Sequence, residues 1–151
     1  MENKTILAIL VIIIILLIIG FVGYTFFTNQ NEKIKIDNVD FNLPEGYHQT
    51  KSLNNDDEIN ITNGFNTMLL SKCDANNARK NVYDYKDYKL KENLSVRVSN
   101  FTVNNITIYK AVVVNHTNTI HYWFDYGNKT YTIYTWNGNE NNDKVVSELV
   151  K

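Results

Sequence analysis

Hydrophobic and polar residues divide the chain into two parts with different patterns. Residues 6–27 are uncharged and mostly apolar, whereas the rest alternates between apolar and polar residues, with turns rich in asparagine and glycine. About 22 such residues can cross the ~30 Å hydrocarbon core of a bilayer as a helix. We expect a short tail over 1–5, a transmembrane helix over 6–27, a linker over 28–33 and one folded domain over 34–151.

The end of the apolar stretch favours a retained anchor over a cleaved signal peptide. A signal peptide has an apolar core of about 7–15 residues followed by small side chains. Here the run is longer, and Tyr24, Phe26 and Phe27 occupy its end. Such aromatic residues are typical of the membrane–water interface. The pattern therefore predicts a single-pass, signal-anchor protein whose partner through 6–27 is the lipid bilayer.

Glycosylation motifs bear on the orientation, because the charges on the two sides of the stretch do not decide it. Six Asn-x-Ser/Thr motifs follow the stretch, and their acceptors would be Asn60, Asn93, Asn100, Asn105, Asn115 and Asn128. An asparagine-rich composition also produces such motifs by chance. Together with the short amino-terminal tail, they favour a cell-membrane protein with its C-terminal domain outside the cytoplasm.

The first half of the domain pattern predicts strands and one helix. Ile34 to Leu43 alternates as one strand, with a bulge or bend where the phase slips after Ile36. Pro44-Glu45-Gly46 is typical of a turn. Asn63-Gly64 predicts a two-residue hairpin turn. Asp74 is a candidate helix cap, followed by one helical face of apolar residues that includes Ala78, Val82 and Tyr85.

The second half predicts an antiparallel meander and a closing helix. Asn104-Asn105 and Gly127-Asn128 separate alternating segments, and glycine in the first position suits a type II′ turn. Residues 143–151 carry the period of a short amphipathic helix. The expected fold class is α+β, with one N-terminal transmembrane helix followed by an antiparallel β-sheet, a meander of hairpins, packed against one or two helices.

The last hairpin has two faces with different chemistry. A two-residue loop places Tyr126 opposite Lys129 and fixes which side chains share a face. The first face is apolar enough for a core and carries Ile120, Tyr122, Phe124, Tyr126, Tyr131 and Ile133. The second face carries His121, Trp123, Asp125, Thr130, Thr132, Tyr134 and Trp136. The candidate partner-binding residues on this second face are His121, Trp123, Asp125, Tyr134 and Trp136.

Three interpretations of the second face stay open. A helix covers it as a second core layer, or it is a partly exposed aromatic platform for an envelope protein or polymer, or it holds a metal. The metal is disfavoured because His121 and Asp125, four residues apart on a strand, are separated by about 13 Å. We therefore expect no metal ligands.

Composition and missing motifs exclude several other functions. The net charge of −1 gives no electrostatic attraction to nucleic acid. Cys73 is the only cysteine, which rules out an internal disulfide and predicts a small buried residue. The chain has no Gly-x-Ser-x-Gly, phosphate loop, His-Glu-x-x-His or Cys-x-x-Cys motif. We expect no catalytic residues, no cofactor and no enzyme activity.

Three segments together resemble the Mog1/PsbP-like pattern: Phe41–Tyr47 with its Pro-Glu-Gly turn, Tyr122–Tyr134, and Asp143–Val150. The chain also resembles small single-span membrane proteins of unknown function from methanogenic archaea. The resemblance implies an α+β sandwich with a binding or accessory role. It supplies no catalytic residues to transfer.

These observations predict a single-pass membrane-anchored protein that displays a small extracytoplasmic binding or envelope-associated domain. One alternative is a pilin-like structural subunit, although no glycine cleavage position precedes the apolar run and no glutamate lies just inside it. The other alternative is an enzyme that uses the His121/Trp123/Asp125 face.

Overall fold

The structure is a computed structural model of the whole chain. It describes residues 13–18, 32–50, 57–115, 119–139 and 141–151. The chain divides into two compact units, Met1–Glu32 and Lys33–Lys151.

In the first unit the structure describes a helical segment over residues 13–18. Among the described residues, no helix is both long and apolar enough to cross a membrane. This finding contradicts the predicted transmembrane helix over 6–27, and with it the predicted single-pass, signal-anchor protein of the cell membrane with its C-terminal domain outside the cytoplasm. The rest of 6–27 and the tail 1–5 lie outside the described residues.

The described part of the second unit is mostly β-structure in two antiparallel sheets. A two-stranded sheet pairs β1 (Lys33–Ile36) with β2 (Val39–Asn42). The order of the seven-stranded sheet is β3-β4-β5-β9-β8-β7-β6. Its strands are β3 (His48–Thr50), β4 (Glu58–Thr62), β5 (Thr67–Lys72), β6 (Val96–Val103), β7 (Ile106–Val113), β8 (Ile120–Tyr126) and β9 (Lys129–Thr135).

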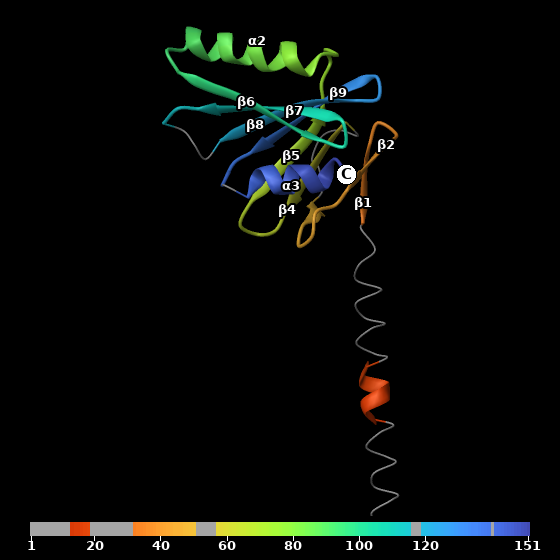
Figure 1. Ribbon diagram of the computed structural model, residues 1–151. Coiled ribbons are helices and arrows are strands. Elements are labelled where there is room, and N and C mark those ends of the chain that lie inside the picture. The colour runs from red at the N-terminus through yellow and green to blue at the C-terminus, as the bar shows by residue number, and fades with distance from the viewer. Residues whose placement is uncertain (1–12, 19–31, 51–56, 116–118, 140) are drawn as a thin grey trace, which may run out of the picture. The chain divides into compact units, whose positions relative to one another are not determined.

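The predicted α+β class headed by a transmembrane helix is therefore wrong. The period-2 alternation of β-branched and aromatic residues fills most of the second unit, and that pattern favours strands. Helical periods are confined to α2 (Ala78–Lys91) and α3 (Asn142–Leu149). These two helices lie on opposite faces of the seven-stranded sheet (Figure 1).

The face that α3 covers holds the larger core. Tyr122, Phe124 and Tyr131 are fully buried there against the β1–β2 hairpin and α3. The ring of Phe41 from β2 meets Tyr131 edge-on, with centroids 4.9 Å apart. Asp37 in the hairpin turn forms ion pairs with Lys72 of β5, at 2.8 Å, and with Lys129 of β9. The hairpin is thus tied to the large sheet by aromatic packing and by a shared carboxylate.

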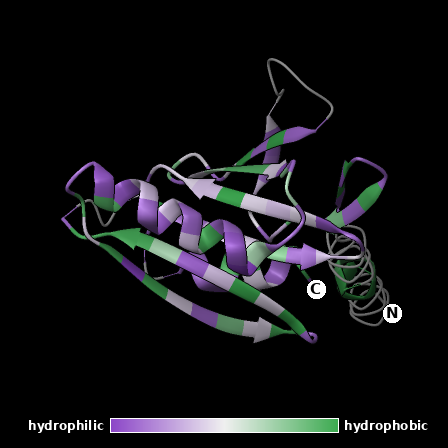
Figure 2. Cartoon of the chain, turned by 90° about the horizontal axis from the view of Figure 1, so that it is seen from above, coloured by the Kyte–Doolittle hydropathy of each residue, from purple (hydrophilic) through white to green (hydrophobic). Residues whose placement is uncertain are grey.

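The face that α2 covers holds a smaller core. Ala78 and Val82 of the helix pack with Ala111 and Trp123 of the sheet. Figure 2 shows α2 running across the strands with a mostly hydrophilic outward surface. The contacts of α2 are with β6, β7 and β8, so this helix covers only part of its face.

The apolar residues of β6 change from one face of the sheet to the other after Val98. Val96 and Val98 pack in the core under α2, whereas Phe101 and Val103 pack in the core under α3. The strand pairs with β7 without interruption over its whole length. One regular strand therefore buries opposite faces at its two ends.

Two predicted connections differ from the structure: the bend after Ile36 and the Asn63-Gly64 turn. The segment expected as one bent strand is a hairpin, because Asp37 and Asn38 both have positive φ, 46° and 65°, as a type I′ turn requires. The Asn63-Gly64 hairpin exists, but its loop runs from Asn63 to Asn66, with Thr62 paired to Thr67. The Asn63 side chain stabilises this longer loop by accepting hydrogen bonds from two backbone N–H groups of the loop.

Other local predictions are confirmed. The backbone N–H of Tyr47 donates to the carbonyl of Pro44 and closes the Pro-Glu-Gly turn. Gly127 has a φ of 61°, and Tyr126 pairs with Lys129 as expected.

The start of α2 differs from the prediction. The helix begins later than expected, because the side chain of Asn77 rather than that of Asp74 accepts the capping hydrogen bond.

Candidate functional site

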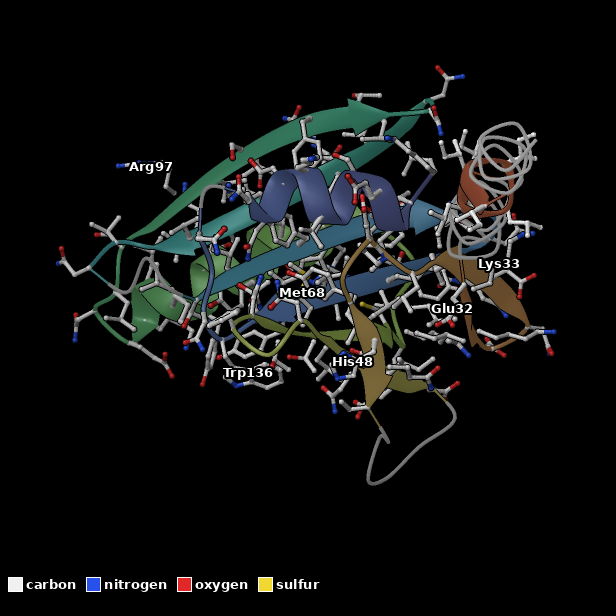
Figure 3. The ribbon with its side chains drawn as sticks, turned by 90° about the horizontal axis from the view of Figure 1, so that it is seen from below. Glu32, Lys33, His48, Met68, Arg97 and Trp136 are labelled. Carbon is white, nitrogen blue, oxygen red and sulfur yellow. The ribbon has the colours of Figure 1, made fainter. Side chains whose placement is uncertain are left out.

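The predicted partner-binding face is divided by the edge of α2. Trp123 on β8 is only 6% exposed because α2 packs over it. Tyr134 on β9 is half-buried, and Trp136 just beyond β9 is 45% exposed. Figure 3 shows Trp136 at the periphery of the molecule, whereas Met68 lies within the sheet. Two of the three interpretations therefore each hold for one part of the face: a helix covers the part around Trp123, and the part around Trp136 is an exposed aromatic surface.

Asp125 holds α2 in place. Its Oδ1 accepts hydrogen bonds from the backbone N–H of Ala78, at 3.0 Å, and from the hydroxyl of Thr130. The first turn of α2 has no acidic residue of its own. A carboxylate at this position satisfies an unpaired N–H and complements the positive end of the helix. Asp125 is therefore bound to the helix through its Oδ1, although the residue itself is exposed.

His121 lies among aromatic rings at the margin of α2. Its ring centroid is 4.7 Å from Tyr85, 5.3 Å from Trp123 and 4.3 Å from Tyr134. Both imidazole nitrogens are buried and have no hydrogen-bond partner among the described residues. Burial, assisted by the positive charge of Lys89, lowers the pKa of His121 to about 4. At neutral pH the ring is uncharged and offers one donor and one acceptor.

A pocket of about 300 Å³ opens beside His121. We call it the aromatic pocket; its wall includes Tyr85, Lys89, Leu94, Val113, His121 and Tyr134. The wall is mainly aromatic and aliphatic. Its volume is at the lower end for ligand pockets, enough for one ring or one side chain.

The rings beside the pocket continue toward solvent as an aromatic row, which we define as Tyr85, His121, Tyr134 and Trp136. Tyr134 and Trp136 meet edge-on with centroids 4.8 Å apart. Phe65, in the loop before β5, is 89% exposed, and its carbonyl accepts a hydrogen bond from the Asn137 side chain. Exposed aromatic side chains thus gather near the end of β9.

Sequence reasoning missed two of these residues. Tyr85 is at the helical period of the α2 face, which indicates core packing but does not reveal that its ring lies over His121. Phe65 was expected within a strand, and it is exposed because the loop is longer than two residues. The Asn63-Gly64 pair was the only local signal for that loop.

The candidate glycosylation sites differ in exposure. Asn93, Asn105, Asn115 and Asn128 are exposed in turns. Asn100 is exposed on the edge strand β6, whereas Asn60 is half-buried on β4. Whether any of the six is modified stays a prediction.

Other reactive residues offer little chemistry. Within the described ranges, no cluster of three or more His, Cys, Asp or Glu side chains is placed to hold a metal ion. Burial raises the pKa of the Cys73 thiol to about 11, so it is protonated at neutral pH. His48 is exposed on β3, and His116 lies outside the described residues.

Of the five candidate binding residues, His121, Tyr134 and Trp136 face the aromatic pocket or solvent. Trp123 and Asp125 are engaged by α2. No protein-family model matches this chain, and no curated protein matches it at a significant level.

Proposed function

We propose that the domain of the second unit is a binding module that receives an apolar side chain of a partner protein in the aromatic pocket. The observation that carries the proposal is the uncharged, unpartnered imidazole of His121 beside a pocket whose aromatic wall continues to the exposed Trp136. Tyrosine and tryptophan are enriched in protein–protein interfaces and dominate their binding energy.

The charge of the pocket favours an apolar side chain. Among the described residues of its wall, Lys89 is the only charged one. Its ammonium group is 2.7 Å from the carboxylate of Glu92 and lies over the ring of Tyr85. The charge of Lys89 is thus already compensated, and a charged side chain entering the pocket would lose hydration without gaining a new partner.

The unpaired nitrogens of His121 favour a peptide. A neutral imidazole needs one acceptor and one donor, and every peptide unit carries a C=O and an N–H. A buried polar atom without a partner costs about 1–3 kcal/mol. Both nitrogens are buried, so the side chains around His121 must shift before a partner segment can reach them. The hydrogen bond that the segment then forms recovers part of this cost.

The same geometry argues against the enzyme alternative. Asp125 is bound to α2 and does not orient the imidazole of His121, whose nitrogens have no partner in the described part of the chain. A base with a pKa of about 4 is weakly basic at neutral pH. A binding role also agrees with the accessory role that the Mog1/PsbP-like resemblance implies.

The test is an NMR titration of the full chain with three blocked amino acids: N-acetyl-leucine amide, N-acetyl-phenylalanine amide and N-acetyl-lysine amide. We expect saturable shifts of the Tyr85, His121 and Tyr134 signals with the leucine and phenylalanine probes only. Tyr134→Ser should weaken binding about tenfold, through the loss of roughly 1.4 kcal/mol of ring contact.

Tyr83→Ser is the matched control, because Tyr83 is exposed on α2 and is not part of the pocket wall. It should leave the affinity unchanged. Equal shifts with the lysine probe, or saturation at residues away from the pocket, would overturn the proposal.

A further inference from the structure

The seven-stranded sheet ends in two edge strands that are protected differently. Strand β3 has three residues, whereas β6 has eight and pairs with β7 without interruption. Short length, lysine, proline and bulges protect exposed sheet edges from pairing with other chains. Strand β3 is short, but β6 has none of these features. Its only charged residue is Arg97, which Figure 3 shows at the outer margin of the molecule.

Half of the backbone groups of β6 point away from the sheet. The backbone N–H of Val114 donates to the carbonyl of Ser95 at 2.8 Å, which marks these two residues as a hydrogen-bonded pair. Such pairs alternate along an antiparallel ladder, so every second residue from Ser95 onward bonds to β7. The residues between them direct their N–H and C=O groups to the open edge: Val96, Val98, Asn100 and Thr102. The sheet ends at β6, so no further strand among the described residues pairs with these groups.

We propose that this edge pairs with the same edge of a second copy of the chain. The two β6 strands run antiparallel about a two-fold axis at Ser99, and the two seven-stranded sheets join into one. An axis at a residue, rather than between two residues, places outward-directed residues opposite each other and keeps the side chains on matching faces. The axis at Ser99 allows about eight inter-chain hydrogen bonds, from the pairs Val96–Thr102 and Val98–Asn100, whereas an axis at Asn100 allows about six.

The side chains of β6 are complementary to themselves in this register. Arg97 lies opposite Phe101 of the second copy in a non-hydrogen-bonded pair, where side chains approach most closely. A guanidinium group over an aromatic ring is a favourable contact. Because Arg97 is the only charged residue of β6, no two like charges oppose each other. This self-complementarity favours a second copy over an unrelated peptide as the occupant of the edge.

The size of the contact predicts a reversible dimer. One strand per copy forms a smaller interface than a standard stable complex, so we expect dimerisation to depend on concentration. No described wall residue of the aromatic pocket lies on β6, and the pairing does not depend on the function proposed for that pocket. A glycan at Asn100 would occupy the same edge. The proposal therefore applies to the chain that is unmodified at Asn100.

The test measures amide hydrogen exchange along β6 by NMR, in the unmodified full chain at low and high chain concentration. In the dimer the N–H groups of the four outward-directed residues become hydrogen-bonded, and their exchange should slow about tenfold at high concentration. Slow exchange is expected at both concentrations for the N–H groups that bond to β7, those of Arg97, Ser99, Phe101 and Val103. This alternation identifies pairing through β6 even where residues 6–27 also associate.

Charges at Ser99 test the register, because Ser99 is exposed and lies opposite itself in the dimer. Ser99→Glu places two carboxylates opposite each other and should weaken dimerisation about tenfold or more, as should Ser99→Lys. Lys110, which faces Ser99 from β7, is already paired with Asp143. A mixture of the two variants should recover pairing, because opposite charges then meet. Slow exchange of the N–H groups bonded to β7 shows that each variant is folded.

Gln49→Glu and Gln49→Lys are the matched controls, since Gln49 is the exposed middle residue of the other edge strand, β3. Both should leave the concentration dependence unchanged. Fast exchange of the four outward-directed N–H groups at both concentrations would exclude a second copy as the occupant of this edge and overturn the proposal. Slow exchange that Ser99→Glu does not relieve would also overturn it, and loss of pairing in the Gln49 variants would contradict an interface at β6.

Discussion

The two faces of the seven-stranded sheet are built from the same alternating strands but are completed differently. On the face covered by α3, the Tyr122 hydroxyl donates to Asp143 at 2.8 Å and Lys110 pairs with the same carboxylate, whereas the Tyr131 hydroxyl and the Asn142 Nδ2 are buried without a partner among the described residues. On the face covered by α2, the helix stops short of β9, and His121 is buried with both nitrogens unpaired. Both faces therefore hold buried polar atoms without a partner among the described residues, and the difference between them is in coverage. The β1–β2 hairpin and α3 bury the large aromatic rings of one face, whereas α2 covers only part of the other.

The largest expected difference between the faces is in stability. Phe124→Ala on the α3 face should lower the free energy of unfolding by about 3–5 kcal/mol, because a fully buried ring is replaced by a cavity. Trp136→Ala, on the face that α2 only partly covers, should change the free energy of unfolding by about 0.5 kcal/mol or less, since Trp136 is 45% exposed. Urea unfolding of both variants measures the contrast. Similar losses would show that Trp136 belongs to a core.

The second prediction uses the uncharged state of His121. Its pKa falls from the ordinary 6.5 to about 4 on folding, so below pH 6.5 the unfolded chain binds more protons than the folded chain. The free energy of unfolding should therefore decrease as the pH falls from 6.5 to 4, by about 3 kcal/mol. His121→Leu should remove this decrease and keep near-wild-type stability at pH 7. A variant with an unchanged pH profile would contradict the burial of a neutral ring.

The Asp37 carboxylate should affect the free energy of unfolding in a separate, more acidic pH range. Hydrogen bonds from Lys129 and Lys72 lower its pKa from 3.8 to about 2. The stabilisation by this carboxylate is present above pH 3.8 and is lost as the pH falls toward 2. In the His121→Leu background the remaining acid destabilisation should therefore begin only near pH 4. Asp37→Asn in that background should reduce it, and an identical acid profile would place the effect on other carboxylates.

A smaller effect tests whether Asp125 is structural. Asp125→Ala should lower the free energy of unfolding by about 0.5–2 kcal/mol, because the first turn of α2 loses its carboxylate acceptor. Asp74→Ala, at an exposed position before the helix, is the matched control and should have little effect. Hydrogen exchange at the Ala78 amide measures the local consequence. Unchanged protection of that amide would contradict the role assigned to Asp125.

Sequence patterns predicted the parts of the fold that depend on neighbouring residues. The Gly127-Asn128 turn fixed the register of β8 and β9. That register correctly placed five residues of the first face in the core, Ile120, Tyr122, Phe124, Tyr131 and Ile133, whereas Tyr126, which was expected with them, is 37% exposed. The Asp37-Asn38 turn was missed because this pair is a weaker hairpin signal than Asn-Gly. The membrane prediction depended on the hydropathy and length of residues 6–27 and on the aromatic residues at their end, and no helix among the described residues is long and apolar enough to cross a membrane.

The candidate sites depend on contacts that no local pattern encodes. The extent to which α2 covers β8 but not β9 decides whether His121 has neighbours or solvent beside it. Such coverage is set by tertiary packing, which the helical period of α2 does not specify.

The most direct test of a binding role for the face that α2 only partly covers compares the affinity of N-acetyl-leucine amide for the wild-type chain and for Tyr134→Ser. The affinity is measured by NMR through the His121 ring signals. The incompletely covered face predicts saturable binding by the wild type, about tenfold weaker binding by the variant, and no saturation by N-acetyl-lysine amide. Equal affinity of the two proteins for the leucine probe would contradict a binding site at the aromatic pocket.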